Sequence, residues 1–328
     1  MKKILGIGNA LTDILIRLEN DVCLEKFSLP KGSMQLVESD FSTKILNETQ
    51  ALQRTLVSGG SASNTIHGLA ALGIETGFVG KIGNDSWGNF FESDMKKRGI
   101  NTLLFKGKNE SGRAIALISP DSERTFATYL GAAIELTVND LTSEIYDGYD
   151  YFHIEGYLVQ NRELIETALK MAKEKGLIVS LDMASYNVVD ENRDFLLEMT
   201  KKYVDILFAN EDEAKSFSKE QDYDAALDFM SKHCELAILK KGALGSTIAS
   251  EGKKTNIDIT PVESIDTTGA GDLYAAGFLY ALIMGQPIIK CGLIASYIAS
   301  KVIQVIGPKI SEEQWGEIKQ NIQKIITK

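Results

Sequence analysis

Residues 265–272 of this chain of 328 residues are Ile-Asp-Thr-Thr-Gly-Ala-Gly-Asp, and a small, apolar run follows directly. Two glycines around an alanine allow successive backbone N–H groups to converge where a helix begins, and the helix dipole favours negative charge there. The amides of Gly269, Ala270 and Gly271 are therefore candidates to bind an anion. Asp272 would repel that anion, so we expect it to take a proton from a nucleophile that attacks the anion. This pattern indicates phosphoryl transfer to a hydroxyl group. The alternative is a tight turn in which Asp272 only caps a buried helix.

A second glycine-rich element lies at residues 58–64, with the sequence Ser-Gly-Gly-Ser-Ala-Ser-Asn, and opens another predicted helix. Gly59 and Gly60 allow a ligand to touch the backbone, and Asn64, about one turn later, offers a donor and an acceptor to hydroxyl groups. Helix capping by Ser61 is the alternative. The element is a candidate site for a substrate that carries hydroxyl groups.

Asn9 and Asp13 follow the first predicted strand at a spacing of four residues. Together they can bind vicinal hydroxyls, because a carboxylate accepts two hydrogen bonds. Gly6 and Gly8 resemble the start of a dinucleotide-binding fingerprint, but Leu11 occupies the place of the third glycine. That glycine is needed for helix–strand packing, so a nicotinamide-dependent oxidoreductase is excluded.

Two further polar turns follow predicted strands. Asn210 and Glu213 carry oxygens that can hold Mg²⁺ through water and so neutralise a triphosphate, although capping of an acidic first helical turn explains them as well. Lys240 begins a turn that contains Gly242 and Gly245 and can approach nucleotide phosphates, although its spacing favours a β-hairpin. The common phosphate loop, GxxxxGK[ST], is absent from the sequence.

Composition and charge exclude several classes of function. The formal net charge of −10 argues against a nucleic-acid backbone or an anionic membrane surface as a partner. His153 and Glu155 resemble half of a zinc deaminase site, but no Pro-Cys-x-x-Cys follows. The three cysteines are far apart and lack metal-ligand spacing, which favours a reduced cytoplasm. No apolar run is long and continuous enough for a signal peptide or a bilayer span.

From about residue 150 onward, short β-branched runs alternate with amphipathic segments, which is typical of a parallel sheet flanked by helices. Ligands in such sheets bind beyond the carboxyl ends of the strands, so Asp182, Asn210 and Lys240 should meet the glycine turn at one edge. The predicted strands are 3–8, 151–154, 177–181, 204–208 and 236–239, and the predicted helices are 61–72, 162–175, 193–202 and 223–233.

The first half of the chain also contains short alternating segments rich in turn residues. Residues 113–118 and 124–129, separated by Pro-Asp-Ser-Glu, predict a β-hairpin. We expect a small β lid, formed by about 12–37 and 102–131, inserted into a single domain of residues 1–328. Its exposed sheet edge can pair two chains, so both a monomer and a lid-paired homodimer stay open.

These elements, in this order, resemble the PfkB or ribokinase-like family of ATP-dependent sugar and nucleoside kinases. Residues 59–64 resemble its first signature and residues 266–272 its second, whereas 210–213 resemble its magnesium and phosphate motif. Residues 240–245 resemble its nucleotide-side turn, with lysine where many members carry threonine. The resemblance implies a three-layer αβα core with a mostly parallel sheet, a β lid, the cofactors ATP and Mg²⁺, and often activation by a monovalent cation such as K⁺.

Within the family, the chain most resembles bacterial adenosine kinases. Met34 differs from the glutamine of the animal enzymes. The segments that carry this likeness are 8–14, 27–36, 123–132, 155–158 and 302–308.

The likeness implies transfer of the ATP γ-phosphate to a primary hydroxyl, the ribose 5′-hydroxyl of adenosine or a related nucleoside. A kinase for ribose, fructose or 2-keto-3-deoxygluconate is the alternative, and a non-catalytic nucleotide- or sugar-binding protein is a further one. The implied catalytic residues are Asp272 with the amides of Gly269, Ala270 and Gly271. The implied substrate-binding residues are Asn9, Asp13, Met34, Leu36, Gly59, Gly60, Asn64 and Tyr157. Those for ATP are Asn210, Lys240, Gly242, Gly245 and Thr267, with Glu213 for the metal.

Overall fold

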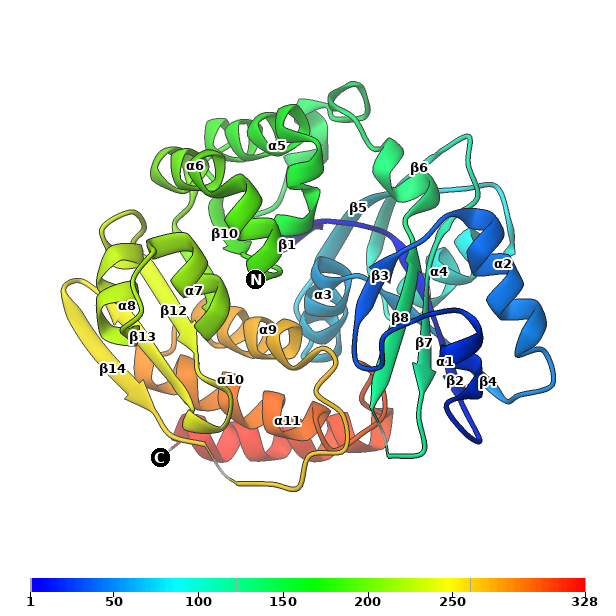
Figure 1. The fold of residues 1–328 in the computed structure, drawn as a ribbon. Helices are drawn as coiled ribbons and strands as arrows, with labels where there is room; N and C mark the ends of the chain where they lie inside the picture. Colours follow the sequence, from blue (N-terminus) through cyan, green and yellow to red (C-terminus); the bar gives the residue numbers. More distant parts are fainter. Residues whose placement is uncertain (1, 122, 260, 328) are drawn as a thin grey trace.

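Nine strands form the main sheet of the computed structural model, which describes residues 2–121, 123–259 and 261–327 (Figure 1). The strand order is β14-β13-β12-β11-β10-β9-β1-β5-β6; the strands from β12 to β6 run parallel, and β13 and β14 are antiparallel. The bounds are β1 Ile4–Ile7, β5 Thr76–Ile82, β6 Asn101–Lys106, β9 Tyr151–Glu155, β10 Ile178–Asp182, β11 Ile206–Asn210, β12 Leu236–Lys240, β13 Ser246–Ser250 and β14 Lys253–Ile257.

Helices cover both faces of this sheet, which is why its central strands are apolar on both sides. Successive strand residues belong to different cores: Phe208 packs in the core on one face, and its neighbour Leu207 in the core on the other. This arrangement confirms the predicted three-layer α/β fold. The first face is covered by α3 Ser61–Ala71, α4 Ser86–Lys97, α9 Ala270–Ile283, α10 Ile288–Val302 and α11 Glu312–Thr327, and the second by α5 Arg162–Glu174, α6 Tyr186–Tyr203, α7 Glu211–Ser218 and α8 Tyr223–Ser231.

A smaller, five-stranded sheet forms the lid, with strand order β3-β8-β7-β2-β4 (Figure 1). Ile14 and Ile16 of β2 pack into an apolar cluster with α1 and α2, so the alternate residues Asp13, Leu15 and Arg17 point to the opposite face. Leu15 there contacts a cluster that includes Ile306 of the main layer. The bounds are β2 Leu11–Arg17, α1 Val22–Lys26, β3 Met34–Leu36, α2 Ser39–Glu48, β4 Arg54–Gly59, β7 Gly112–Ile118 and β8 Arg124–Tyr129.

The lid differs from its predicted boundaries at two places. Residues 102–106 lie in β6, which pairs with β5 of the main sheet, so the second lid segment begins at β7. β4, which precedes the glycine-rich element, was missed and pairs with β2 as a lid edge. The short 3₁₀ helices are η1 Gly131–Glu135, η2 Val138–Asp140, η3 Ser143–Tyr146, η4 Gly156–Gln160 and η5 Gly242–Leu244. Among the described residues, no helix has both the length and the apolar character needed to cross a membrane.

Candidate active site

Asp272 lies in the first turn of α9 and is held by side chains of α3. Its Oδ1 accepts a hydrogen bond from Ser61 Oγ at 2.8 Å, and its Oδ2 accepts one from Asn64 Nδ2 at 2.9 Å. The N-cap of α9 is Gly269, which has a φ of 76°, and no side chain caps this helix end. The alternative in which Asp272 only caps its own helix is therefore wrong. The two glycine-rich elements meet at this carboxylate.

The charge state of Asp272 is set mainly by burial, which raises its pKa to about 6. Hydrogen bonds from Asn64 and Ser61 and the positive charge of Lys240 oppose this rise, whereas the negative charge of Asp182 adds to it. At neutral pH, Asp272 is thus mostly a carboxylate that can accept a proton. A base with a pKa just below the working pH is suited to general-base catalysis.

The turn before α9 provides amides for an anion, but not all three of the predicted ones. Ala270 N–H donates to Thr267 O at 3.1 Å, so this amide is occupied within the turn, and exposed Thr267 contributes its carbonyl. Among the described residues, the backbone N–H groups of Gly269, Gly271 and Asp272 have no backbone acceptor outside their helix. The first N–H groups of a helix lack intrahelical partners. Gly269 and Gly271, with Asp272, therefore stay candidates for the anion site, whereas Ala270 does not.

Lys240 brings a positive charge to the same place. Its Nζ lies 3.1 Å from the position that a Cβ on Gly271 would occupy, and it donates to Asp182 Oδ2 at 2.8 Å. Burial alone would lower the pKa of Lys240, but the carboxylates of Asp182 and Glu213 outweigh it and hold the pKa above its ordinary value. An ammonium group beside open amides strengthens an anion site.

The turn after Lys240 is the β-hairpin that its spacing favoured, because β12 and β13 pair antiparallel through Lys240 and Ser246. Gly242 and Gly245 have φ values of 48° and 82°. A Cβ on Gly245 would lie 2.1 Å from a carbonyl of β14, so only glycine fits there.

Asn210 and Glu213 cap α7 through a reciprocal capping box. Glu213 accepts hydrogen bonds from Asn210 N and Nδ2, both at 2.7 Å, and Asn210 Oδ1 accepts one from Glu213 N. The capping interpretation is thus confirmed, and both carboxylate oxygens of Glu213 already have partners. Burial raises the pKa of Glu213 to about 7, which the nearby charge of Lys240 opposes. Within residues 2–121, 123–259 and 261–327, no cluster of three or more His, Cys, Asp or Glu side chains is arranged around a metal position.

Asp13 lies on the lid face that points to the main layer and contacts the first glycine-rich element. A Cβ on Gly59 would lie 2.0 Å from Asp13 Oδ1, so glycine is required for the carboxylate to fit. Gly60 has a φ of 92°, and a Cβ there would lie 2.2 Å from Asn9 O. Buried Asn64 Oδ1 has no hydrogen-bond partner among the described residues. Asp13 and Asn64 thus offer acceptor oxygens to hydroxyl groups.

Glu155, which the sequence marked only as half of a zinc-site likeness and as part of the segment 155–158, holds Asn9 and α3 together. Its Oε1 accepts hydrogen bonds from Asn9 N at 2.9 Å and Asn9 Nδ2 at 2.7 Å, and its Oε2 accepts one from Ala62 N at 2.7 Å. Burial raises the pKa of Glu155 to about 7, although these hydrogen bonds lower it. Glu155 thus fixes Asn9 against α3, and the side chain of Asn9 keeps its oxygen and one N–H for a ligand. His153 is buried beside Ser180, with 2.8 Å between Nδ1 and Oγ.

Three further predicted substrate-binding residues lie on two elements. Met34 and Leu36 are on β3, the short lid strand beside β8, and both are more than half exposed, at 51% and 56%. Tyr157 is half-buried in η4, directly after β9, and its pKa is raised by burial. Exposed apolar side chains on one strand suit a flat apolar group.

Lys309 places a buried ammonium group close enough to Asp13 for its charge to act on that carboxyl. The segment before Lys309 is fixed to the turn at residues 265–269, here called the anion turn. Gly307 N donates to Asp266 Oδ2 at 2.6 Å, and Pro308 would contact a Cβ on Gly269. Lys309 Nζ is buried and has no hydrogen-bond partner in the described part of the chain, and burial lowers its pKa to about 8. Burial raises the pKa of Asp13 to about 7, and the charge of Lys309 is the strongest influence that opposes this rise.

The charge of Lys309 gives a prediction for pH dependence. If hydroxyl binding needs Asp13 as a carboxylate, kcat/KM falls as the pH drops through about 7. Lys309→Met raises the pKa of Asp13, so the acidic limb moves to higher pH, with about a tenfold loss at pH 6 per pKa unit. The gap closes above pH 9, where Asp13 is ionised in both proteins and Lys309 is neutral. Lys309→Arg keeps the charge and should follow the wild type; parallel profiles for Lys309→Met would contradict the prediction.

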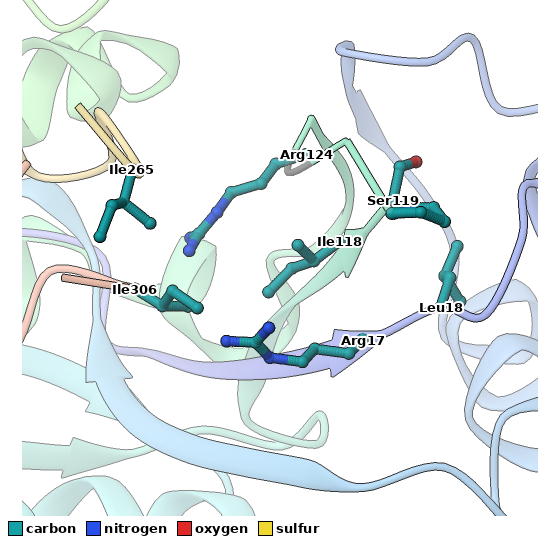
Figure 2. Close-up of a pocket in the computed structure, with 8 residues that line it drawn as sticks. Arg17, Leu18, Ile118, Ser119, Arg124, Ile265 and Ile306 are labelled. Carbon is teal, nitrogen blue, oxygen red and sulfur yellow. The ribbon is translucent and has the colours of Figure 1, made fainter. Parts of the chain in front are cut away.

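Arg124 joins the lid to the anion turn. From β8 its guanidinium group forms an ion pair with Asp266 and donates to Thr268 Oγ1 at 3.2 Å. Asp266 Oδ1 in turn accepts a hydrogen bond from Thr268 N at 3.0 Å. The lid and the second glycine-rich element are thus connected by buried, charged contacts. Figure 2 shows Arg124 at the edge of a pocket that also contains Arg17, Ile265 and Ile306.

Comparison with known proteins identifies the family of this chain. Residues 36–315 match the model of the pfkB family of carbohydrate kinases. The solved adenosine kinase of Sinorhizobium meliloti is 31% identical, with a TM-score of 0.86, and the match covers 96% of this chain and 98% of that one. The adenosine kinase of Schizophyllum commune is 25% identical, covering 94% of this chain and 96% of that protein. The 5-dehydro-2-deoxygluconokinase of Geobacillus thermodenitrificans is 28% identical, and the match covers 81% of this chain and 84% of that protein. The chain belongs to the pfkB family and is an ATP-dependent kinase that acts on a hydroxyl group.

Proposed function

We propose that this kinase transfers the γ-phosphate of ATP to a primary hydroxyl, most readily the ribose 5′-hydroxyl of adenosine or a related nucleoside. The observation that carries the proposal is Asp272, held by Ser61 and Asn64 at the start of α9, next to Gly271 and Lys240. A base and open amides lie in the first turn of α9, and a fixed cation from the end of β12 lies beside them. Phosphoryl transfer needs these parts in one place.

The acceptor binds between the lid and α3. Asp13 and Asn64 accept hydrogen bonds from its secondary hydroxyls, the backbone at Gly59 and Gly60 lies against it, and Asn9 offers its side-chain oxygen. When the secondary hydroxyls are held, the primary hydroxyl lies beside Asp272. This alignment raises the rate because the entropy of orienting the reacting groups is lost on binding and not in the chemical step. Closure of the lid excludes water, which otherwise competes as acceptor.

Asp272 then accepts the proton of the attacking hydroxyl as the new O–P bond forms and the bond to ADP breaks. The N–H groups of Gly271 and Asp272, with Lys240, stabilise the negative charge on the transferring phosphoryl oxygens. Gly242 and Gly245 shape the hairpin turn that lies along the nucleotide. Because Lys240 is already paired with Asp182, its position is set before ATP binds.

Mg²⁺ is expected with ATP, and the residues fit a site held through water. Glu213 has both oxygens bonded to Asn210, and Asp182 is paired with Lys240, so neither offers a bare carboxylate. Mg²⁺ usually keeps several waters and takes its other ligands from substrate phosphates. Bound there, it would supply neutralisation of triphosphate charge, and Glu213 and Asn210 would orient its waters.

The choice of a nucleoside over a free sugar depends on the lid. Met34 and Leu36 present apolar surface from β3, and a nucleobase would cover it, whereas a small sugar would leave it in water. The relative with a solved structure at 31% identity is an adenosine kinase, which supports the same choice. The sugar-kinase alternative is supported by the similarity to 5-dehydro-2-deoxygluconokinases at 28% to 30% identity.

A phosphorylation screen tests the acceptor. We expect adenosine to give a higher kcat/KM than ribose, fructose or 2-keto-3-deoxygluconate, measured as ADP release with ATP and Mg²⁺. Met34→Ser should raise the KM for adenosine and change that for ribose little, because only the nucleobase covers this side chain. A higher kcat/KM for a free sugar would support the sugar-kinase alternative.

A further inference from the structure

Tyr274 forms a buried hydrogen bond between the helix that carries Asp272 and the hairpin that carries Lys240. Its phenol oxygen lies 2.7 Å from Ser246 Oγ. Tyr274 is 6% exposed and Ser246 is 1% exposed, so water does not compete for this bond. The two hydroxyl groups therefore join two elements of the site without taking part in the transfer of the proton or the phosphoryl group.

Both residues stand next to groups that act on the substrates. Tyr274 follows Asp272 by two residues in α9. Ser246 is the first residue of β13, directly after Gly245, and it pairs with Lys240 across the hairpin. Their hydrogen bond thus helps to set the distance between the base and the turn that lies along ATP in the proposed function.

The first turn of α9 is bonded to α3 on one side. Ser61 and Asn64 bond the Asp272 carboxylate, and Thr65 Oγ1 donates to the carbonyl of the same residue at 3.1 Å. Within the described ranges of the chain, the bond to Ser246 is the one side-chain hydrogen bond between α9 and the β12–β13 hairpin. The hydrophobic effect is non-directional, so apolar packing fixes the position of a helix less sharply than a hydrogen bond does.

The phenol of Tyr274 is neutral throughout the working range of pH. Burial raises the pKa of Tyr274 to about 12, although the hydrogen bond with Ser246 and the charge of Lys240 lower it. The bond is therefore present at every pH at which Asp272 acts as a base. An effect that depends on this bond should not vary with pH between about 6 and 9, because neither partner titrates there.

We propose that Tyr274 is a positioning residue for ATP: its hydrogen bond to Ser246 holds the hairpin turn, together with Lys240, at a fixed place relative to the first turn of α9. The inference rests on the proposed role of the hairpin turn toward ATP. Because the turn is held before ATP arrives, less binding free energy is lost in ordering it. Tyr274 acts through Ser246, so its loss should weaken ATP binding more than it slows the chemical step.

Titration calorimetry with a non-hydrolysable ATP analogue, together with steady-state kinetics, tests this proposal. Tyr274→Phe should raise the Kd of the analogue and the KM for ATP about three- to tenfold, the usual effect of losing one hydrogen bond. The KM for the acceptor and kcat should change less, and the rise in the KM for ATP should be equal at both ends of the pH range above. Ser246→Ala should give the same rise, and the double variant should give no larger one, because both changes remove the same bond.

Tyr146→Phe is the matched control. Tyr146 packs in the core on the other face of the sheet, is 1% exposed, and has a hydroxyl without a hydrogen-bond partner among the described residues. The variant removes a buried phenolic oxygen and should leave ATP binding unchanged. A lower melting temperature for Tyr274→Phe with an unchanged Kd and KM for ATP would overturn the proposal, because the bond would then serve stability alone. Additive effects in the double variant would overturn it as well.

Lys240→Met separates a failure of this inference from a failure of the proposed function. If Lys240→Met weakens binding of the analogue and Tyr274→Phe does not, only the positioning role falls. If neither variant weakens it, the hairpin turn does not bind ATP, and both fall. If Tyr274→Phe does not fold, unweakened binding of the analogue by Ser246→Ala overturns the inference equally.

Discussion

Asp272→Asn should lower kcat by about 10²-fold or more while the protein folds and binds ATP as before, because general-base catalysis is worth this much. Asparagine has nearly the shape of aspartate and still accepts one hydrogen bond, so the contacts with Ser61 and Asn64 change little in geometry. Steady-state turnover with the best acceptor measures the effect. Removal of a buried carboxylate whose pKa burial raises should also leave the melting temperature unchanged or higher.

The matched control for this prediction is Ser61→Ala. It removes one of the two hydrogen bonds to Asp272 but keeps the base, so it should lower kcat far less than Asp272→Asn. Near-normal kcat for Asp272→Asn would remove Asp272 from its catalytic role. Equal losses in the two variants would show that the geometry around the carboxylate, and not its basicity, limits turnover.

Lys240→Met should lower kcat/KM by about 10²–10³-fold, the usual effect of removing one group that stabilises charge in the transition state. Lys240 Nζ lies beside Gly271, where the transferring phosphoryl group would be, and the side chain is only 14% exposed. Its loss also leaves Asp182 buried without a counter-charge, which costs stability and repels the triphosphate. Kinetics at saturating acceptor, with thermal unfolding alongside, separate these effects.

Asp182→Asn separates the two roles of Lys240. The variant keeps the ammonium group and removes its partner, so it should retain most of the turnover if Lys240 acts on phosphate. The double variant Lys240→Met/Asp182→Asn should recover stability but not turnover. Recovery of turnover in the double variant would mean that Lys240 serves only to neutralise Asp182.

The main layers of the fold were predictable because they depend on local patterns. Buried parallel strands are continuous apolar runs, and the strand 151–154 and the helices 61–72 and 162–175 lie within about one residue of their predicted ends. The lid was harder to delimit. β4 has a mixed exposure pattern and is a short edge strand, so its sequence carries little alternation, and β6 resembles a lid strand although it pairs with β5.

The site divides in the same way. Asp272, Asn64 and Lys240 were predictable because each stands at the end of a strand or in the first turn of a helix, next to glycines. The roles of Glu155 and Lys309 were not predictable. Glu155 acts through Asn9, which is 146 residues away in sequence, and Lys309 acts through burial that only the tertiary structure creates. The occupied amide of Ala270 likewise depends on the exact turn before α9. Asn210 and Glu213 could be assigned to capping from sequence, and their role toward Mg²⁺ stays a prediction.

The link from Arg124 to Asp266 has a consequence for the timing of the reaction. Asp266 is bonded to Arg124 on a lid strand, to Thr268 in its own turn and to Gly307 after α10. If the lid swings away, Asp266 loses its counter-charge, and the turn that would receive the phosphoryl group loses a support in the same movement. With the acceptor site empty and the lid open, the turn would then stabilise the transferring phosphoryl group less well. Hydrolysis of ATP by water would be slow in that state.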